Sequence, residues 1–480
     1  MKELLTAKPT QLLIIAIVCL SFYSINLFQL DEIANRCLSI AILMIFLWIS
    51  EILPLPVVAL IPLMALPLFG VQKIEEIAPS YANPVIFLFM GGFFLSLAIE
   101  KWNLHKRIAL NIVRITGTSG NRIILGFIIS TAFISMWLSN TATTMMMFPI
   151  ALSVINVVRH ESINEKQTHY FTMSILLSIA YASNFGGLAT IIGTPPNVAF
   201  VSFLDNKYNY SFSFFDWMKL CLPLSIVLLI ILYFLLVKVL FPNHIESKLE
   251  TKEFLHTSLQ ELGSLSNAEK KVLMVFSLTV SLWIFKDLIN KLLIYKIDDS
   301  MIALFGSFLL FVIPAKDSKE SLLQWKDTAK MSWGILVLFG GGIALANSLE
   351  KAGILKLFGV FIAQYSHLGL FPLMVLVALI SIFLSEVMSN VAQVIVLSPI
   401  VCTIADALGI SPLLLGMPMV LGASCASMLP MGTPPNAIAF SSGEIPLKQM
   451  IKTGFTLNII CLIVISLFCY YLMPYLVKLP

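Results

Sequence analysis

Long apolar stretches dominate the chain and are separated by short polar connectors. Clear examples run over residues 12–30, 37–53, 57–71, 220–241 and 457–477. Each has close to the ~20 residues that an α-helix needs to cross the hydrocarbon core of a bilayer. Unpaired backbone groups are costly in lipid, so continuous apolar runs span as helices, and the sequence lacks the short alternating segments of a barrel. The pattern predicts an all-α polytopic membrane protein.

Two apolar stretches carry polar residues in their middle, where a straight span would not place them. Residues 123–158 contain Ser139 and Asn140, and residues 368–408 contain the same pair at 389–390. A helical hairpin that enters and leaves on one side puts such residues at its tip. Re-entrant backbone is tolerated where it lines a cavity or is buried in protein. We therefore predict two re-entrant hairpins with polar tips.

The chain also contains an internal repeat. The Ser-Asn pair recurs at an offset of 250 residues, and the same offset aligns Leu-Phe-Met-Gly-Gly at 88–92 with Leu-Phe-Gly-Gly-Gly at 338–342. Such a shared register indicates duplication. An odd number of spans in each copy would invert the second relative to the first. We predict an N-terminal span in 1–36, a first inverted repeat in 37–241, a cytoplasmic connector in 242–270 and a second inverted repeat in 271–480.

Charge is scarce and unevenly placed. Of the 480 residues, 58% are hydrophobic and 12% are charged, which is about half the charged fraction of an average soluble protein. Basic residues gather near 101–122, 248–271 and 316–330, and basic connectors face the cytoplasm. We expect a multi-pass inner-membrane protein with a cytoplasmic N-terminus and an outside C-terminus. Its basic rim should meet lipid headgroups, and no nucleic acid is expected as a partner.

Two broken helices are predicted by the run Gly-Thr-Pro-Pro-Asn at 193–197 and again at 432–436. Paired prolines remove two N–H donors and clash with the preceding turn, so a helix must break there. The break frees carbonyl oxygens, which suit a hard cation, and exposes the N-terminus of the next half-helix, which suits an anion. Each half thus offers a hairpin tip that faces a broken helix.

Basic side chains are missing around the four motifs, and this indicates which ion accompanies an anionic substrate. No lysine or arginine occurs in 123–158, 167–206 or 357–447, the three windows that hold all four motifs. An anionic substrate there would need bound cations to offset its charge, which predicts Na+ coupling. Proton coupling would call for several intramembrane carboxylates, and the windows offer mainly Glu386 and Asp406. No organic cofactor is expected.

The paired Ser-Asn and Gly-Thr-Pro-Pro-Asn motifs resemble those of the divalent anion:sodium symporter family, which includes bacterial dicarboxylate, citrate and sulfate carriers. The resemblance covers nearly the whole chain after the first span. It implies a homodimer of about eleven transmembrane helices per protomer, with two re-entrant hairpins. It also implies inverted repeats and a transport domain that moves like an elevator against a scaffold.

The resemblance also implies site residues. One Na+ would be held by Ser135, Ser139, Asn140 and Gly193, and a second by Ser385, Met388, Asn390 and Gly432. The anion would be bordered by Asn140, Thr141, Thr194, Pro195, Asn390, Val391, Thr433 and Pro434. Carboxylate carriers of the family often have threonine at the position of Val391. Valine cannot donate a hydrogen bond, at a cost of roughly 1 kcal/mol or more if the anion lies there, so a different, smaller or asymmetrically bound anion could result.

These observations favour a Na+-coupled secondary transporter (a symporter) of divalent anions, with a C4-dicarboxylate such as succinate as the expected small-molecule substrate. Two alternatives on the same fold are a Na+-independent dicarboxylate or tricarboxylate antiporter and a sulfate-type inorganic anion carrier. A channel would need a continuous polar pore, whereas the polar residues form two clusters. An enzyme would need an acid–base or metal constellation, and the membrane windows contain none, so no enzymatic activity is predicted.

Overall fold

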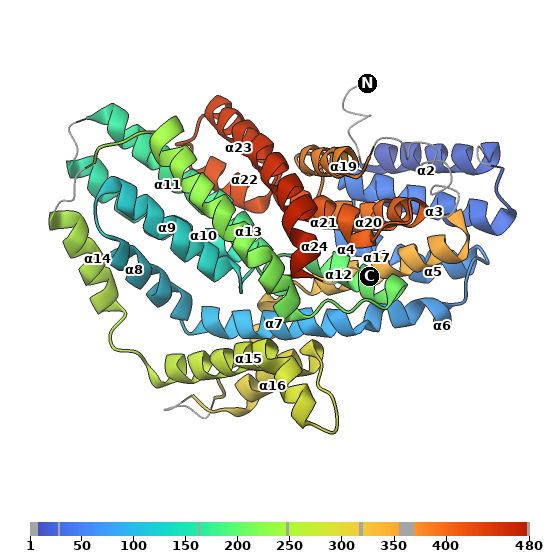
Figure 1. Cartoon of the computed structure of the whole chain (residues 1–480), viewed down its shortest axis with the longest axis horizontal. Helices are drawn as coiled ribbons and strands as arrows, with labels where there is room; N and C mark the ends of the chain where they lie inside the picture. The colour runs from blue at the N-terminus through green and yellow to red at the C-terminus, as the bar shows by residue number, and fades with distance from the viewer. Residues whose placement is uncertain are drawn as a thin grey trace.

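The computed structural model of the chain describes residues 8–26, 29–161, 164–245, 249–315, 320–354 and 369–477. Within them every regular element is a helix (Figure 1). Nine helical segments of this described part are long and apolar enough to cross a membrane, and shorter apolar helices accompany them. The all-α prediction is confirmed.

The first helices follow the apolar runs of the sequence with shifted boundaries. They are α2 (Lys8–Ile25), α3 (Glu32–Ser50), α4 (Leu55–Val58), α5 (Ile61–Leu68), α6 (Ile74–Ile77) and α7 (Pro84–Lys101). Asp31 caps α3 by accepting a hydrogen bond from the backbone N–H of Ala34, which satisfies one of the free donors at a helix start. Prolines near the starts of α4 and α5 divide the third apolar run into two short helices.

An amphipathic helix and a helical hairpin come next. They are α8 (Leu104–Thr116), α9 (Gly120–Ser135) and α10 (Asn140–Glu161). Helix α8 packs against α9, where Val113 lies close to Gly126. Ala109, Leu110 and Val113 are buried, whereas Ile115 is exposed. Only residues 136–139 connect α9 to α10, and the two helices contact each other. The Ser-Asn pair therefore lies at the turn of a hairpin, as the sequence predicts.

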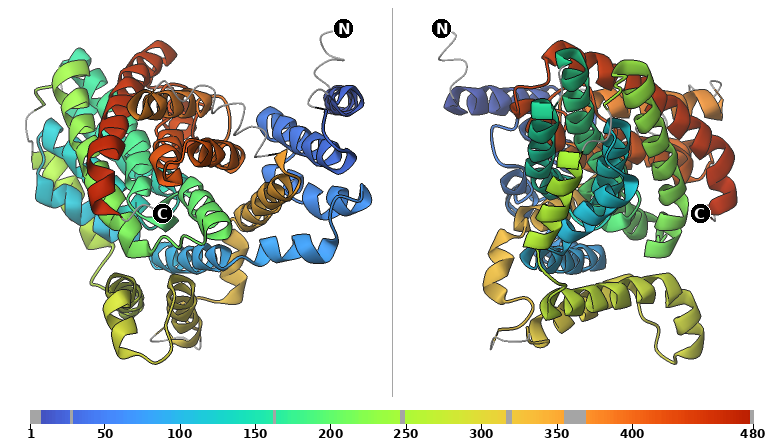
Figure 2. Two further views of the ribbon diagram at one scale, coloured as in Figure 1. Left: turned by 45° about the vertical axis from the view of Figure 1, so that its right-hand side comes forward. Right: turned by 90° about the vertical axis from the view of Figure 1, so that its left-hand side faces the viewer.

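The first broken helix consists of α11 (Glu165–Leu188) and α12 (Pro195–Tyr208), and α13 (Phe214–Phe234) follows it. The expected polar connector then contains a helix of its own, α14 (Leu249–Glu261), which lies against α8 and α10. Helix α15 (Asn267–Leu292) starts with a capping box between Ser266 and Glu269. With α16 (Asp299–Val312) it packs on α7, and the pair forms the lower edge of the molecule in Figures 1 and 2.

The second half repeats the pattern of the first. It contains α17 (Trp333–Lys351), α19 (Leu370–Leu384), α20 (Asn390–Ala407), α21 (Pro412–Ala423), α22 (Pro434–Ser441), α23 (Leu447–Leu467) and α24 (Met473–Leu476). Residues 385–389 connect α19 to α20, so the second Ser-Asn pair also lies in a hairpin turn. Helix α21 packs on α19, α20 and α23, just as α11 packs on α9, α10 and α13.

The two halves interlock through their broken helices. Helix α12 of the first half packs on α20, which belongs to the hairpin of the second half. Reciprocally, α22 of the second half packs on α10 of the first. Each hairpin is therefore covered by the long part of its own broken helix and by the short part of the other one, so all four polar motifs gather in one region.

Candidate functional site

The tip of the first hairpin is bonded to the first broken helix. The Ser135 hydroxyl lies 2.8 Å from Oδ1 of Asn140 and 2.8 Å from the backbone oxygen of Ser183. Ser135 is fully buried at the end of α9, and Asn140 is half-buried at the start of α10. This arrangement brings three oxygens together where α11 approaches its break.

The second half reproduces this cluster. The Ser385 hydroxyl lies 2.5 Å from Oδ1 of Asn390 and 2.5 Å from the backbone oxygen of Ala423. Ser385 is again fully buried and Asn390 half-buried. Two equivalent groups of neutral oxygens therefore exist, and neutral oxygens together with backbone carbonyls suit a hard monovalent cation.

The last residue of each Gly-Thr-Pro-Pro-Asn run closes the break in its helix. The Asn197 side-chain amide donates to the backbone oxygens of Gly187 (3.1 Å) and Thr190 (2.9 Å). The Asn436 amide donates in the same way to Ala426 and Leu429, both at 3.2 Å. These bonds satisfy carbonyls that the broken helix leaves free. Asn197 and Asn436 also keep a buried Oδ1 without a hydrogen-bond partner.

Glycine is required where the break meets the hairpin tip. A Cβ atom on Gly187 would collide with Oδ1 of Asn140, and a Cβ on Gly193 would lie 2.5 Å from the backbone oxygen of Gly187. In the second half, a Cβ on Gly432 would lie 2.7 Å from a carboxylate oxygen of Glu386. The backbone therefore approaches the side-chain oxygens of Asn140 and Glu386 so closely that a side chain at Gly187 or Gly432 would displace them.

A chain of side-chain amides joins the two halves. The Asn140 amide donates to Oδ1 of Asn184 at 3.3 Å, and the Asn184 amide donates to the hydroxyl of Thr433 at 3.3 Å. The Tyr181 hydroxyl also donates to the backbone oxygen of Ser427 at 3.0 Å. Asn184 is not among the site residues predicted from the sequence. An amide in the wholly buried, mostly apolar part of α11 was the available signal, since such groups are costly without partners.

The remaining residues named from the sequence lie at the same junctions. Thr194 and Thr433 precede the first turns of α12 and α22, and Pro195 and Pro434 occupy those turns. The Ser139 hydroxyl accepts a hydrogen bond from the N–H of Ala142, which caps α10. Three further residues lie at or beside the hairpin turns, namely Thr141, Met388 and Val391. The assignment of all these residues to ions or to substrate stays a prediction.

No described lysine or arginine makes a hydrogen bond or ion pair with the motif residues. The ion pairs of the described chain lie elsewhere, for example Lys207 with Asp406 at 3.1 Å and Arg159 with Glu444 at 2.9 Å. The positive ends of the half-helices α12 and α22 are therefore the nearest fixed partial charges for an anion. Such a site needs additional positive charge to hold a divalent anion.

Glu386, in the turn of the second hairpin, has a structural role. It is 1% exposed, and its carboxylate accepts the backbone N–H groups of Ser427, Met428 and Leu429, each at 2.8 Å. The Asn458 amide of α23 donates to it at 2.7 Å. Four donors surround the buried carboxylate, and none of them is a basic side chain of the described residues. The carboxylate therefore ties the hairpin turn to the break between α21 and α22.

Substituting Glu386 by glutamine should destabilise the folded protein. The glutamine amide would turn N–H groups toward backbone N–H donors, and each donor left unpaired costs about 1–3 kcal/mol. We expect a lower apparent melting temperature in detergent. Glu444→Gln is the matched control, because its exposed ion pair should contribute at most about 1 kcal/mol. Equal melting temperatures for the two variants would contradict this role.

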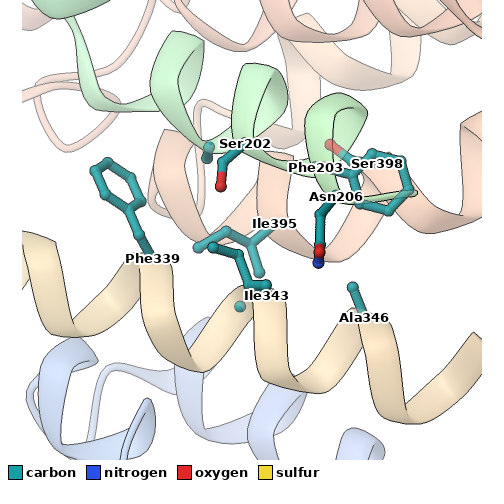
Figure 3. Close-up of a pocket in the computed structure, with 10 residues that line it drawn as sticks. Ser202, Phe203, Asn206, Phe339, Ile343, Ala346, Ile395 and Ser398 are labelled. Atoms are coloured by element: carbon teal, nitrogen blue, oxygen red, sulfur yellow. The ribbon is translucent and has the colours of Figure 1, made fainter. Parts of the chain in front are cut away.

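The second segments of the two broken helices, α12 and α22, differ in how far they are buried. Residues 196–204 of α12 are buried, whereas Pro434, Ala437 and Ser441 of α22 are exposed. Helix α17 packs on α12 and α20, while its repeat partner α7 packs on α12, α15, α16 and α17. Figure 3 shows the remaining gap between α12, α17 and α20, a cavity of about 20 Å³. That is room for about one water molecule, so α12 packs closely against α17 and α20 here.

Comparison with known proteins agrees with this architecture. The family model described as "Sodium:sulfate symporter transmembrane region" matches residues 6–479. The chain is 37% identical over 458 residues to the "Sodium-dependent dicarboxylate transporter SdcS" of Staphylococcus saprophyticus, covering 93% of this chain and 88% of the relative. It is 38% identical over 436 residues to the Staphylococcus aureus protein of the same name (strain USA300), covering 89% and 84%.

The fold also matches a solved structure at low sequence identity. The crystal structure of the Alcanivorax borkumensis YdaH transporter superposes with a TM-score of 0.52 and 10% identity, covering 83% of this chain and 87% of that one. This likeness concerns the fold alone. The extent of the family match and the identity to the staphylococcal relatives are decisive. The chain belongs to the family of the sodium:sulfate symporter transmembrane region, and the family resemblance inferred from its motifs is confirmed.

Proposed function

We propose that this protein is a Na+-coupled symporter of divalent anions and that its substrate is a C4-dicarboxylate such as succinate. The observation that carries the proposal is the duplicated cluster of neutral oxygens with no basic side chain of the described chain in contact with it. The names of the staphylococcal relatives, which cover most of this chain, support Na+ dependence and a dicarboxylate substrate.

In this proposal each oxygen cluster holds one Na+ as a co-transported ion. The first uses Ser135, Ser139, Asn140 and the backbone of Gly193; the second uses Ser385, Asn390 and the backbones of Met388 and Gly432. The anion lies between the hairpin tips and the starts of α12 and α22. It is bordered by Asn140, Thr141, Thr194, Pro195, Asn390, Val391, Thr433 and Pro434.

The Na+ ions would organise the pocket as well as neutralise the anion. Ser135 and Ser385 now place their hydroxyls against Oδ1 of Asn140 and Asn390. A cation at either cluster would draw these oxygens to itself and fix the asparagine side chains. By linkage, Na+ then raises the affinity for the anion, and the anion raises the affinity for Na+ by the same factor.

We further propose a homodimer in the inner membrane, with about eleven spans per protomer and a cytoplasmic N-terminus. The inverted repeats would be residues 37–241 and 271–480. In this topology the connector after α22 faces the cytoplasm, so the exposed side of α22 corresponds to an inward-open state. The elevator movement would then carry α12 and α20 along α17 to open the other side.

Uptake of labelled succinate into proteoliposomes tests the coupling. We expect accumulation only with an inward Na+ gradient and a loss of most uptake when choline replaces Na+. Counterflow of succinate without Na+ would instead identify the antiporter. Full competition by sulfate, with little competition by fumarate or malate, would identify the inorganic-anion carrier that the valine at 391 leaves open. Empty liposomes are the control for leakage.

A further inference from the structure

A second cavity lies away from the candidate site, between the N-terminal helices and the second hairpin. Its volume is about 270 Å³, and its walls come from α2, α3, α17, α20 and Ile354, which follows α17. All thirteen described residues that line it are apolar. Leu38 and Leu345 are among them and are buried, at 7% and 3% exposed. The cavity shares only Ala346 and Ile395 with the small cavity of Figure 3.

The chemistry of this cavity excludes the common occupants. Water needs two to four polar partners, and the described walls offer no polar side chain. The candidate anion and Na+ would lose their hydration without compensation. A dry cavity of about 150 Å³ is already large enough to bind benzene in an engineered protein, so a cavity of 270 Å³ would leave many wall atoms without van der Waals partners if it stayed empty.

The cavity also reaches the surface of the molecule. Ile42 of α3, Leu349 of α17 and Val396 of α20 line it and are themselves half-exposed. The neighbouring Phe46 and Ile49 on α3 are 43% and 45% exposed. In a protein that spans a bilayer, an apolar opening at such a surface meets hydrocarbon chains.

We propose that this cavity binds an acyl chain of a bilayer phospholipid. The chain would enter between α3 and α20 and reach Leu38 and Leu345 at the inner end. It would fill the gap between a hairpin helix, α20, and two helices outside the hairpin, α3 and α17. The acyl chain would therefore contact both the second hairpin and the helices that pack beside it.

Photolabelling tests this site without measuring transport, so its outcome is independent of the proposed function. The protein is placed in nanodiscs that contain phosphatidylethanolamine with a diazirine near the end of one acyl chain, irradiated and analysed by peptide mass spectrometry. We expect adducts on Leu38 and Leu345. The exposed residues Ile230 and Phe234 of α13 serve as positive references, and the fully buried Phe185 and Phe200 as negative ones.

Ala41→Phe should fill the cavity, because Ala41 lines it from α3 and is 1% exposed. We expect the adducts on Leu38 and Leu345 to fall at least about fivefold while those on Ile230 and Phe234 stay unchanged. Leu349→Trp, from the opposite wall, gives the same test if the first variant does not fold. Labelling of Leu38 and Leu345 no stronger than that of Phe185, or unchanged labelling in both variants, would overturn the proposal.

Discussion

Replacing Asn140 or Asn390 by alanine is expected to abolish Na+-driven uptake while the protein still folds. Each asparagine offers Oδ1 to the serine hydroxyl of its own cluster, and Asn140 also donates to Asn184. Alanine removes a proposed ligand of Na+, whereas the serine hydroxyls keep their hydrogen bonds to the backbone oxygens of Ser183 and Ala423, so the fold is retained. The loss of one ligand, at roughly 3 kcal/mol in the Na+-loaded state, corresponds to about 100-fold weaker Na+ binding, and uptake at a given Na+ concentration falls with it.

The control must separate loss of the site from loss of the fold. Asn111→Ala is suitable, because Asn111 is half-buried on α8 and, among the described residues, its amide bonds to the backbone oxygen of Arg107 alone. We expect that variant to keep nearly normal uptake. All three variants should elute as monodisperse protein with similar melting temperatures. Undiminished uptake in both Asn140→Ala and Asn390→Ala would remove the basis of the site assignment.

A cross-link between α12 and α17 should stop transport completely. The Asn206 amide on α12 donates to Oδ1 of Asn347 on α17 at 2.7 Å. If transport requires α12 to move along α17, cysteines at these two positions, joined by a short bifunctional thiosulfonate, will hold the protein in one state. We expect uptake to fall to the level of empty liposomes and to return after reduction. The seven native cysteines are all buried, so the reagent should reach mainly the introduced pair.

A second cross-link on the same helix is the matched control. Lys207 on α12 and Asp406 on α20 lie 3.1 Å apart at their charged atoms, and in the proposed movement these two helices travel together. Cysteines at 207 and 406, treated with the same reagent, should leave most uptake intact. Inhibition by both cross-links would argue against a rigid unit of α12 and α20. Inhibition by neither would argue against movement along α17.

Much of the site could be predicted from local sequence signals. Proline pairs break helices wherever they occur, and the Ser-Asn pairs stand out because amides in apolar segments are costly unless they are bonded. These signals located both hairpins and both broken helices. They did not reveal Asn184 or the four donors around Glu386, because those partners are remote in sequence. Asn184 bonds to Thr433, 249 residues away, and Glu386 to backbone groups more than 40 residues away.

The sequence alone also left two structural questions open that depend on packing. The polar connector contains α14, whose position against α8 and α10 follows from contacts with distant helices. The unequal burial of α12 and α22 is likewise absent from the motifs, since both helices begin with the same Pro-Pro-Asn. The shared motif residues are buried in both copies apart from the first proline, so the difference arises further along each helix and from the helices packed against it.

Hydrophobic length, helix-breaking prolines and the repeat register determined, without any coordinates, that this chain is a helical membrane protein with two hairpin tips and two broken helices. They could do so because the cost of unpaired backbone in lipid and the geometry of proline act over a few residues. Only the tertiary structure decided which half covers which, which amides join the halves, and which of the two broken helices is buried. Those outcomes depend on contacts between segments hundreds of residues apart, whose free energy no local pattern contains.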